Sequence, residues 1–254
     1  MNKNIPENWQ HLIPIKTKDS YKYVHGHALI YGAPKMTGAT NLAASACARM
    51  GAGLVSVLAN KKISDIYRTI LPAHIIIQDD LKWFDKRVTA RLYGSGGLPI
   101  KPDFNSDIPT VLDADALKKL PLILKPNYVL TPHQGEFEKT FPYIKGIEVE
   151  RSLEAARQIN AYVVLKGAKT VIAAPDGRYA INESDAPYLA TAGTGDVLAG
   201  MITGLIAQKM PIFEACCAAV WIHSKCAHHF GMGLVSTDLV DISPIILQKL
   251  VEKS

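Results

Sequence analysis

The residues best suited to chemistry form the run Thr191-Ala192-Gly193-Thr194-Gly195-Asp196, which leads directly into an apolar segment over residues 197–207. Glycines at the start of a helix leave its first N–H groups open, and these groups bind anions such as phosphate. The negative charge of Asp196 opposes a bound anion, unless the carboxylate faces a metal ion or removes a proton from a hydroxyl. The run therefore suggests phosphoryl transfer. An ordinary helix start, with Thr194 as N-cap, explains the same residues equally well.

Composition allows a large buried core, and we expect residues 1–254 to form a single α/β domain. The chain has 254 residues, of which 48% are hydrophobic, and a mean hydropathy of +0.08. No apolar run is long enough to span a bilayer, and the polar start lacks a signal-peptide pattern. Four cysteines in so long a chain do not form a disulfide framework. We therefore expect a soluble cytoplasmic protein without a membrane partner.

The net charge is +5, but the sequence contains no run of five like charges. Nucleic acid is therefore not expected as a partner. Anionic small molecules are sufficient partners for a chain of this charge.

The elements that must position the chemistry alternate between strand and helix. We predict a strand over residues 28–31, a loop over 32–38, a helix over 39–50 and a strand over 54–59, which together form a βαβ unit. Gly51 and Gly53 are candidates to end the helix. Several further predicted strands are continuous apolar runs, as in a parallel sheet that is covered on both faces. They span residues 75–77, 91–93, 110–112, 128–130 and 162–165.

The second half of the chain adds a hairpin and then helices. Asp176-Gly177 reads as the turn between strands over 170–174 and 179–181, which would form an antiparallel edge. Helices are predicted over 197–207 and 214–230, and a last one begins at Ser236. Gly200 and Gly204 lie on one stripe of the first of these helices. Since each glycine costs about 1 kcal/mol in a helix interior, close approach to a neighbouring element is expected there.

Ligands of open parallel sheets bind beyond the carboxyl ends of the strands. Small, acidic, imidazole and basic residues follow the predicted strands at 32–39, 94–97, 113–115, 131–136 and 166–170. The glycines over 32–40 lack the Walker spacing and its Lys-Ser/Thr pair, and Gly51-Ala52-Gly53 precedes a strand rather than a helix. Both standard nucleotide motifs are therefore rejected, and residues 166–170 and 193–196 are the best candidates to hold a nucleotide.

Several of these residues also have plain structural explanations. Asp113 and Asp115 fit ordinary loop turns as well as a metal or substrate site. His133 could be a solvated loop histidine, and Lys166 an exposed lysine instead of a phosphate contact. No paired ligand spacing supports a metal site, so helix packing is the favoured explanation for Cys216, His223 and Cys226.

Six segments together resemble the ADP-dependent NAD(P)H-hydrate dehydratases of the ribokinase-like superfamily, over nearly the whole chain. The combination of Leu-Asp-Ala-Asp-Ala-Leu and Thr-Pro-His-x-Gly-Glu is more specific than the Gly-Thr-Gly-Asp motif, which many kinases of the superfamily share. The resemblance implies a three-layer αβα sandwich with a mostly parallel central sheet. The matching segments are 37–39, 49–55, 112–117, 131–136, 164–172 and 189–200.

The resemblance also implies an activity: dehydration of hydrated NADH or NADPH back to the working cofactor, with ADP, or alternatively ATP, as co-substrate and Mg²⁺ as cofactor. No metal ligand is assigned. Asp196 is expected to be the catalytic base, and the hydrated cofactor is expected to contact Ala39, Gly96, His133 and Asp196. The adenine nucleotide and its phosphates are expected at Lys166, Gly167, Ala168, Lys169, Thr170, Gly193, Thr194 and Gly195. A homotetramer is implied, and a separate epimerase is expected because no epimerase domain precedes the first strand.

The chain departs from the family pattern at a few positions: Tyr23 and Ala192 where glycine is usual, Gln134 where proline is common, and Gly94-Ser95-Gly96-Gly97-Leu98 in place of Gly-Pro-Gly-Leu-Gly. Two other functions remain open. One is a kinase of the same superfamily that phosphorylates a vitamin precursor with ATP and uses Asp196 as base. The other is a nucleotide-binding regulator that has lost catalysis.

Overall fold

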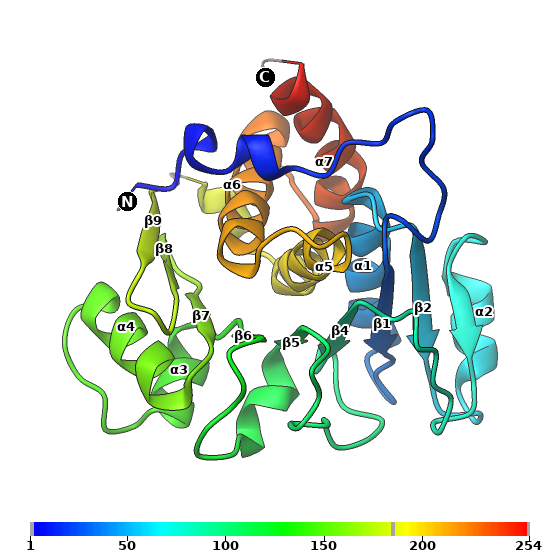
Figure 1. Cartoon of the computed structure of the whole chain (residues 1–254), viewed down its shortest axis with the longest axis horizontal. Helices are drawn as coiled ribbons and strands as arrows, with labels where there is room; N and C mark the ends of the chain where they lie inside the picture. The colour runs from blue at the N-terminus through cyan, green and yellow to red at the C-terminus, as the bar shows by residue number, and fades with distance from the viewer. Residues whose placement is uncertain (1–2, 184–185, 253–254) are drawn as a thin grey trace.

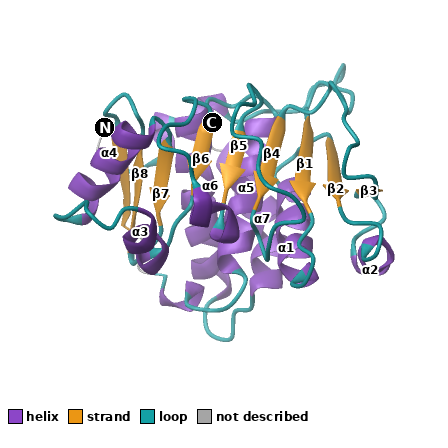
Figure 2. Ribbon diagram, turned by 90° about the horizontal axis from the view of Figure 1, so that it is seen from below, coloured by secondary structure: helices purple, strands orange, loops and turns teal. Residues whose placement is uncertain are grey.

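The computed structural model describes residues 3–183 and 186–252, which are organised around one nine-stranded sheet. The strand order is β3-β2-β1-β4-β5-β6-β7-β8-β9, and Figure 2 shows these strands side by side from β8 to β3. All pairs from β3 to β7 are parallel, whereas β8 pairs antiparallel with both β7 and β9. The strands are β1 (His27–Tyr31), β2 (Leu54–Leu58), β3 (Ile76–Gln78), β4 (Ala90–Tyr93), β5 (Thr110–Leu112), β6 (Tyr128–Leu130), β7 (Tyr162–Leu165), β8 (Lys169–Ala173) and β9 (Tyr179–Glu183).

Helices cover both faces of the sheet. The α-helices are α1 (Thr37–Arg49), α2 (Ser64–Ile70), α3 (Gln134–Thr140), α4 (Glu148–Ile159), α5 (Thr194–Ala207), α6 (Ile212–Phe230) and α7 (Ser236–Val251). The 3-10 helices are η1 (Pro6–Asn8), η2 (Gln10–Leu12), η3 (Ala114–Lys119) and η4 (Pro187–Leu189). In Figure 1, α1, α5, α6 and α7 gather on one side of the sheet, while α3 and α4 lie on the other. None of the described helices is long and apolar enough to cross a membrane.

Alternation along the strands produces two separate hydrophobic cores. In β1, Ala28 and Ile30 join the core under α1, α5, α6 and α7, whereas Leu29 and Tyr31 join the core under α3 and α4. Val111 and Leu112 divide between the two cores in the same way. Both faces of the strands are therefore apolar, which explains their continuous hydrophobic runs. The three-layer αβα sandwich with a mostly parallel sheet is confirmed.

The predicted strands agree closely with the structure, whereas three helices begin earlier in the chain than predicted. Strands over 110–112, 128–130 and 162–165 and the antiparallel hairpin are confirmed, and β3 is displaced by one residue. Helices α1, α5 and α6 begin at Thr37, Thr194 and Ile212, two or three residues before the predicted starts. Apolar periodicity marks the buried part of a helix, and the first turn of each of these helices precedes that part.

The glycine stripe of α5 lets this helix approach α1 closely, as predicted. A Cβ atom added at Gly200 would lie 2.1 Å from the carbonyl oxygen of Ala43, and one at Gly204 would lie 2.5 Å from that of Cys47. These distances are far below van der Waals contact, so the two backbones pack directly against each other. This contact fixes the start of α5 relative to the loop that precedes α1.

We expect Gly200→Ala to lower the free energy of unfolding by about 2 kcal/mol or more. The added methyl group must displace the α1 backbone, and this strain outweighs the gain of about 1 kcal/mol in helix propensity. Denaturant unfolding measures the change. Gly38→Ala is the matched control, because Gly38 also lies in a helix but an added Cβ there meets nothing within 4 Å. Equal stability of the two variants would contradict the close packing of α1 and α5.

Candidate functional site

Four adjacent strands end in a polar residue at the same edge of the sheet. Ser95 follows β4 by two residues, and Asp113, Thr131 and Lys166 directly follow β5, β6 and β7. Because β4 to β7 are neighbours and parallel, their carboxyl ends meet side by side. Helix α5 begins at this edge, so the predicted phosphate site and the strand-end residues form one site.

Asp113 is the centre of a buried polar network. Its side chain is only 4% exposed, and its Oδ1 accepts hydrogen bonds from Lys166 Nζ at 3.0 Å and Thr131 Oγ1 at 2.8 Å. Its Oδ2 accepts from Ser95 Oγ at 3.3 Å. A buried carboxylate is tolerated only when it is paired and hydrogen-bonded, and these three donors meet that requirement. The Asp113–Lys166 pair thereby holds a positive charge next to the start of α5.

Asp196 lies in the first turn of α5 and has an altered acidity. Its pKa is raised to about 6, chiefly by burial and next by the charge of Asp113, while Ser95 and Lys166 act in the opposite direction. A carboxylate with this pKa is ionised near neutral pH but is a stronger base than an ordinary aspartate. The position therefore suits a general base, the role expected of Asp196 from the sequence.

The start of α5 leaves its backbone N–H groups open to a ligand. Gly193 is the N-cap residue with φ +89°, and no side chain caps the helix. Thr194 is not the N-cap, because its hydroxyl donates to the carbonyl oxygens of Leu189 and Thr191 at 3.0 and 3.1 Å. The Lys166 ammonium lies close, 3.3 Å from the position a Cβ would take on Gly195. Open N–H groups, the helix dipole and this ammonium together favour a phosphate at this point.

A cavity of about 560 Å³ opens beside the start of α5. Six residues predicted to contact the nucleotide line it, namely Lys166, Gly167, Ala168, Thr170, Thr194 and Gly195. Its remaining walls include the apolar side chains of Leu189, Leu198 and Val220. A mostly apolar cavity with a few convergent polar groups is typical of a small-molecule site.

Lys169 does not line this cavity. Its side chain is 69% exposed and pairs with Glu183 across the hairpin at 3.3 Å between Nζ and Oε1. Side chains alternate along a strand, so Lys169 and Thr170 point to opposite sides of β8. The Lys169 side chain therefore points away from this cavity.

His133 is exposed, yet its side chain has a structural role. It is the N-cap of α3, where its Nδ1 accepts hydrogen bonds from the backbone N–H groups of Gly135 and Glu136 at 3.0 and 3.3 Å. An accepting Nδ1 places the imidazole proton on Nε2, which makes that atom a donor. This atom lies 3.6 Å from Glu136 Oε2, and the ring also lines the cavity beside α5. His133 is therefore more than a solvated loop histidine.

Ala39, in the first turn of α1, and Gly96, in the loop after β4, are both expected to contact the substrate, and they are neighbours in the structure. Gly96 has φ +79°, and a Cβ added there would lie 2.7 Å from the Cβ of Ala39. The altered loop still contains three glycines with positive φ, at 94, 96 and 97. Ala192 is exposed, and its φ is not positive. Its methyl group therefore introduces no backbone strain before Gly193.

Three other predicted candidates do not line the cavity beside α5. Asp115 is on η3, where it pairs with Lys118 at 2.5 Å, so it is separate from the Asp113 network. Cys216 and Cys226 are fully buried in the helical core, and burial raises the pKa of both thiols. Within residues 3–183 and 186–252, no group of three His, Cys, Asp or Glu side chains could hold a metal ion. The packing interpretation of these cysteines is in agreement with their burial.

Sequence reasoning did not assign the roles of three residues that shape the site. Ser95 and Thr131 were seen only as parts of strand-end loops, and their role depends on which strands are neighbours. His223 is buried, and its Nε2 donates to the carbonyl oxygen of Thr194 at 2.9 Å. Burial lowers the pKa of His223 to about 4, so it is neutral and anchors the first turn of α5. From the sequence, His223 was considered only together with Cys216 and Cys226, because its contact with Thr194 depends on how α6 packs against α5.

Comparison with known proteins places the chain among its relatives. A family model described as NAD(P)H-hydrate dehydratase matches residues 27–246. The ADP-dependent (S)-NAD(P)H-hydrate dehydratase of Neisseria meningitidis is 35% identical over 245 residues, which cover 85% of this chain and 81% of that protein. The bifunctional NAD(P)H-hydrate repair enzyme of Coxiella burnetii is 34% identical over 90% of this chain and 51% of its own length. The chain thus spans about half the length of such bifunctional relatives.

Solved structures are similar over the whole fold. The ADP/ATP-dependent NAD(P)H-hydrate dehydratase of Bacillus subtilis, co-crystallised with ATP and Mg²⁺, has a TM-score of 0.87 and 29% identity, and the match covers 98% of each chain. A ribokinase-like superfamily protein of Enterococcus faecalis has a TM-score of 0.82 at 22% identity, over 99% of this chain and 96% of its own, and supports the fold alone. The resemblance seen in the sequence is confirmed, and the chain belongs to the NAD(P)H-hydrate dehydratase family.

Proposed function

We propose that this protein dehydrates the (6S) hydrate of NADH or NADPH and consumes ADP, which yields the reduced cofactor, AMP and phosphate. The observation that carries the proposal is the position of Asp196. A carboxylate with a pKa of about 6 stands beside the open N–H groups of α5 and the Lys166 ammonium. A base and a phosphate site within one turn of helix are what phosphorylation of a hydroxyl requires.

In the first step, Asp196 accepts the proton of the hydroxyl on the hydrated ring. The hydroxyl oxygen then attacks the terminal phosphorus of ADP. The bond between this phosphorus and the bridging oxygen breaks, and AMP leaves with the electron pair. The Thr194 and Gly195 N–H groups and the Lys166 ammonium face the charge that develops on the transferring phosphoryl group. Asp113 keeps Lys166 in this place through their 3.0 Å pair.

In the second step, the phosphorylated hydroxyl leaves as phosphate. Hydroxide is a poor leaving group, whereas phosphate departs readily when the lone pair of the ring nitrogen pushes it out. Loss of a proton from the neighbouring ring carbon then restores the double bond. His133 Nε2 and the Gly96–Ala39 contact lie around the ring in this arrangement, as the family resemblance implies.

Magnesium would enter this site with the nucleotide. The described residues offer no three-ligand cluster, and the Asp113 carboxylate is already occupied by Lys166, Thr131 and Ser95. Mg²⁺ is commonly held by substrate phosphates with few protein ligands, and it neutralises their charge when bound. The residues therefore fit a nucleotide-borne Mg²⁺ better than a resident metal site.

We further propose a cytoplasmic homotetramer that works together with a separate epimerase and that uses ADP, or alternatively ATP, as co-substrate. These properties follow from the family resemblance. Sedimentation of the purified protein measures the oligomeric state. The ratio of turnover with ADP to turnover with ATP measures the nucleotide preference.

The activity itself is tested with acid-hydrated NADH and NADPH. We expect ADP-dependent recovery of reduced-nicotinamide absorbance, with release of AMP and phosphate in equal amounts. ATP together with a vitamin-precursor alcohol forms the second arm of the assay, because a kinase of the superfamily would use the same base. No recovery in the first arm with phosphorylation in the second would overturn the dehydratase. No turnover in either arm would indicate a regulator.

A further inference from the structure

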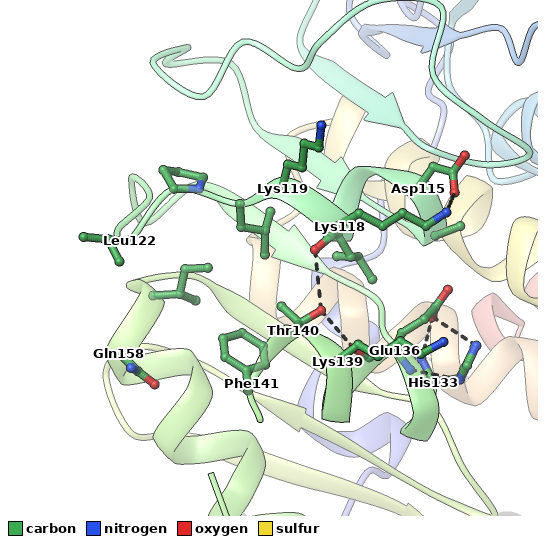
Figure 3. A pocket seen from close by; sticks show the side chains of 15 residues that line it. Asp115, Lys118, Lys119, Leu122, His133, Glu136, Lys139, Thr140, Phe141 and Gln158 are labelled. Atoms are coloured by element: carbon green, nitrogen blue, oxygen red, sulfur yellow. Dashed lines mark hydrogen bonds and ion pairs between the residues drawn. The ribbon is translucent and has the colours of Figure 1, made fainter. Parts of the chain in front are cut away.

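A second cavity, of about 570 Å³, lies between η3 and α3 and has no role so far. Figure 3 shows its lining from close by. Its floor is apolar and well packed, since Leu117, Phe141 and Ile159 are all buried. Thr140 joins the two elements beneath it, because its hydroxyl donates to the carbonyl oxygens of Glu136 and Leu117 at 2.8 and 3.5 Å. The η3–α3 cavity is therefore a formed part of the fold, within the size range of about 300–1,000 Å³ for small-molecule sites.

This cavity adjoins the candidate active site. His133 lines both the η3–α3 cavity and the cavity beside α5. On the other side, Asp115 Oδ2 lies 3.9 Å from the position a Cβ would take on Gly97, in the loop that carries Ser95. A ligand with one end at Asp196 can thus extend past His133 and Asp115 into the η3–α3 cavity without leaving the protein surface.

The cavity has a positive rim. Lys118, Lys119 and Lys139 line it together with two acids, Asp115 and Glu136. Both acids are already engaged: Asp115 binds Lys118 at 2.5 Å, and Glu136 Oε2 accepts from the His133 backbone N–H at 2.9 Å. Figure 3 shows both interactions. Neither Lys119 nor Lys139 forms an ion pair or side-chain hydrogen bond with another described residue, so two cationic groups are free to meet an anion.

We propose that the η3–α3 cavity binds the adenosine-phosphate half of the hydrated dinucleotide. The apolar floor accepts the flat adenine, and Lys119 and Lys139 supply positive charge at the rim for the phosphate groups. The inference rests on the proposed function, because that function supplies a ligand with two nucleotide halves. One half occupies the site at Asp196, and the other requires a second cavity with an apolar surface and free positive charge. The 2′-phosphate of NADPH adds negative charge at that end, so NADPH binds more tightly than NADH.

The test is binding of NADPH and NADH, followed by their fluorescence, to the full chain and to a Lys119→Glu/Lys139→Glu double variant. We expect the Kd for NADPH to rise about tenfold and that for NADH to rise less, because two attractive charges become repulsive. The KM for the hydrate should rise in parallel, while kcat and the affinity for ADP stay unchanged. Lys62→Glu/Lys249→Glu is the matched control, since it makes the same change of net charge at exposed lysines outside both cavities.

An NADPH affinity and a hydrate KM equal to those of the control would overturn the proposal, and so would an equal loss of ADP affinity. These results are distinct from a failure of the proposed function. Binding of NADPH needs no turnover, so weaker binding by the double variant would support the dinucleotide cavity even if the parent protein did not dehydrate the hydrate. Turnover in the parent with unchanged binding in the variant would remove the cavity proposal alone.

Discussion

Asp196→Asn should lower turnover of the hydrated cofactor by about 10²–10⁴-fold, the usual contribution of a general base. The amide keeps the size of the side chain but cannot accept the hydroxyl proton. Nucleotide binding should persist, because the α5 N–H groups and Lys166 are unchanged and a negative charge near the phosphates is removed. Steady-state kinetics and ADP titration measure the two effects. A variant with parental turnover would show that another group is the base.

The same substitution should stabilise the fold at neutral pH. The pKa of Asp196 rises from 3.8 to about 6 on folding, so the folded state favours the neutral acid and ionisation lowers the free energy of unfolding. This penalty is absent below the unfolded pKa, grows as pH rises from about 4 to 6, and is full above that range. We expect Asp196→Asn to recover up to about 2 kcal/mol at pH 8, or roughly 4–8 °C in Tm, and nothing near pH 4.

Asp241→Asn is the control for this stability difference, because Asp241 is 73% exposed on α7 and its carboxylate lies 3.8 Å from Arg49. It should change Tm little at either pH. If Asp196→Asn were stabilised equally at all pH values, burial would not destabilise the ionised carboxylate of Asp196. Loss of activity with gain of stability is the pattern expected where a buried charge is kept for catalysis.

The edge of the sheet that carries the site could be predicted because it depends on local patterns. Continuous apolar runs identify parallel strands, and the residues after them must meet at one edge. Asp113 and Lys166 were found in this way, and α5 was placed beside them by its glycines and its apolar run. The partners of Asp113 could not be found, since Ser95 and Thr131 reach it only through the lateral order β4-β5-β6.

Residues that look alike in the sequence were separated by the backbone. For both Asp113 and Asp115, the sequence allows either a loop turn or a metal or substrate site. In the structure, Ala114 between them has φ +43° and begins η3. That turn buries the first carboxylate in the network and directs the second toward Lys118 on the surface. Likewise, His133 was known to follow a strand, but its role as N-cap depends on the short helix α3, whose start has no long apolar pattern. Such distinctions depend on single backbone angles and not on composition.

Asp113→Asn tests whether this buried carboxylate positions Lys166 and tunes Asp196. In the parent protein, kcat/KM should rise with pH as Asp196 ionises near its pKa of about 6. The charge of Asp113 is the second contribution to that raised pKa, and its removal leaves the Lys166 charge to act on Asp196 alone. We therefore expect the acid limb of the pH profile to move to lower pH by roughly one unit. Turnover at pH 8 should fall at least about tenfold, because Lys166 loses the charge that holds it beside the phosphate.

The shift of the pH profile separates this role from a merely structural one. The substitution should also lower the free energy of unfolding by about 1–3 kcal/mol, since a part-buried ammonium loses its ionic partner. Lower stability alone would reduce the amount of active enzyme without moving the acid limb. Asp107→Asn is the matched control, because Asp107 precedes the same strand, β5, at the opposite edge and pairs with Lys125 while 93% exposed. If the acid limb of Asp113→Asn coincided with that of this control, Asp113 would have no influence on the base, and the coupling of the buried network to Asp196 would be wrong.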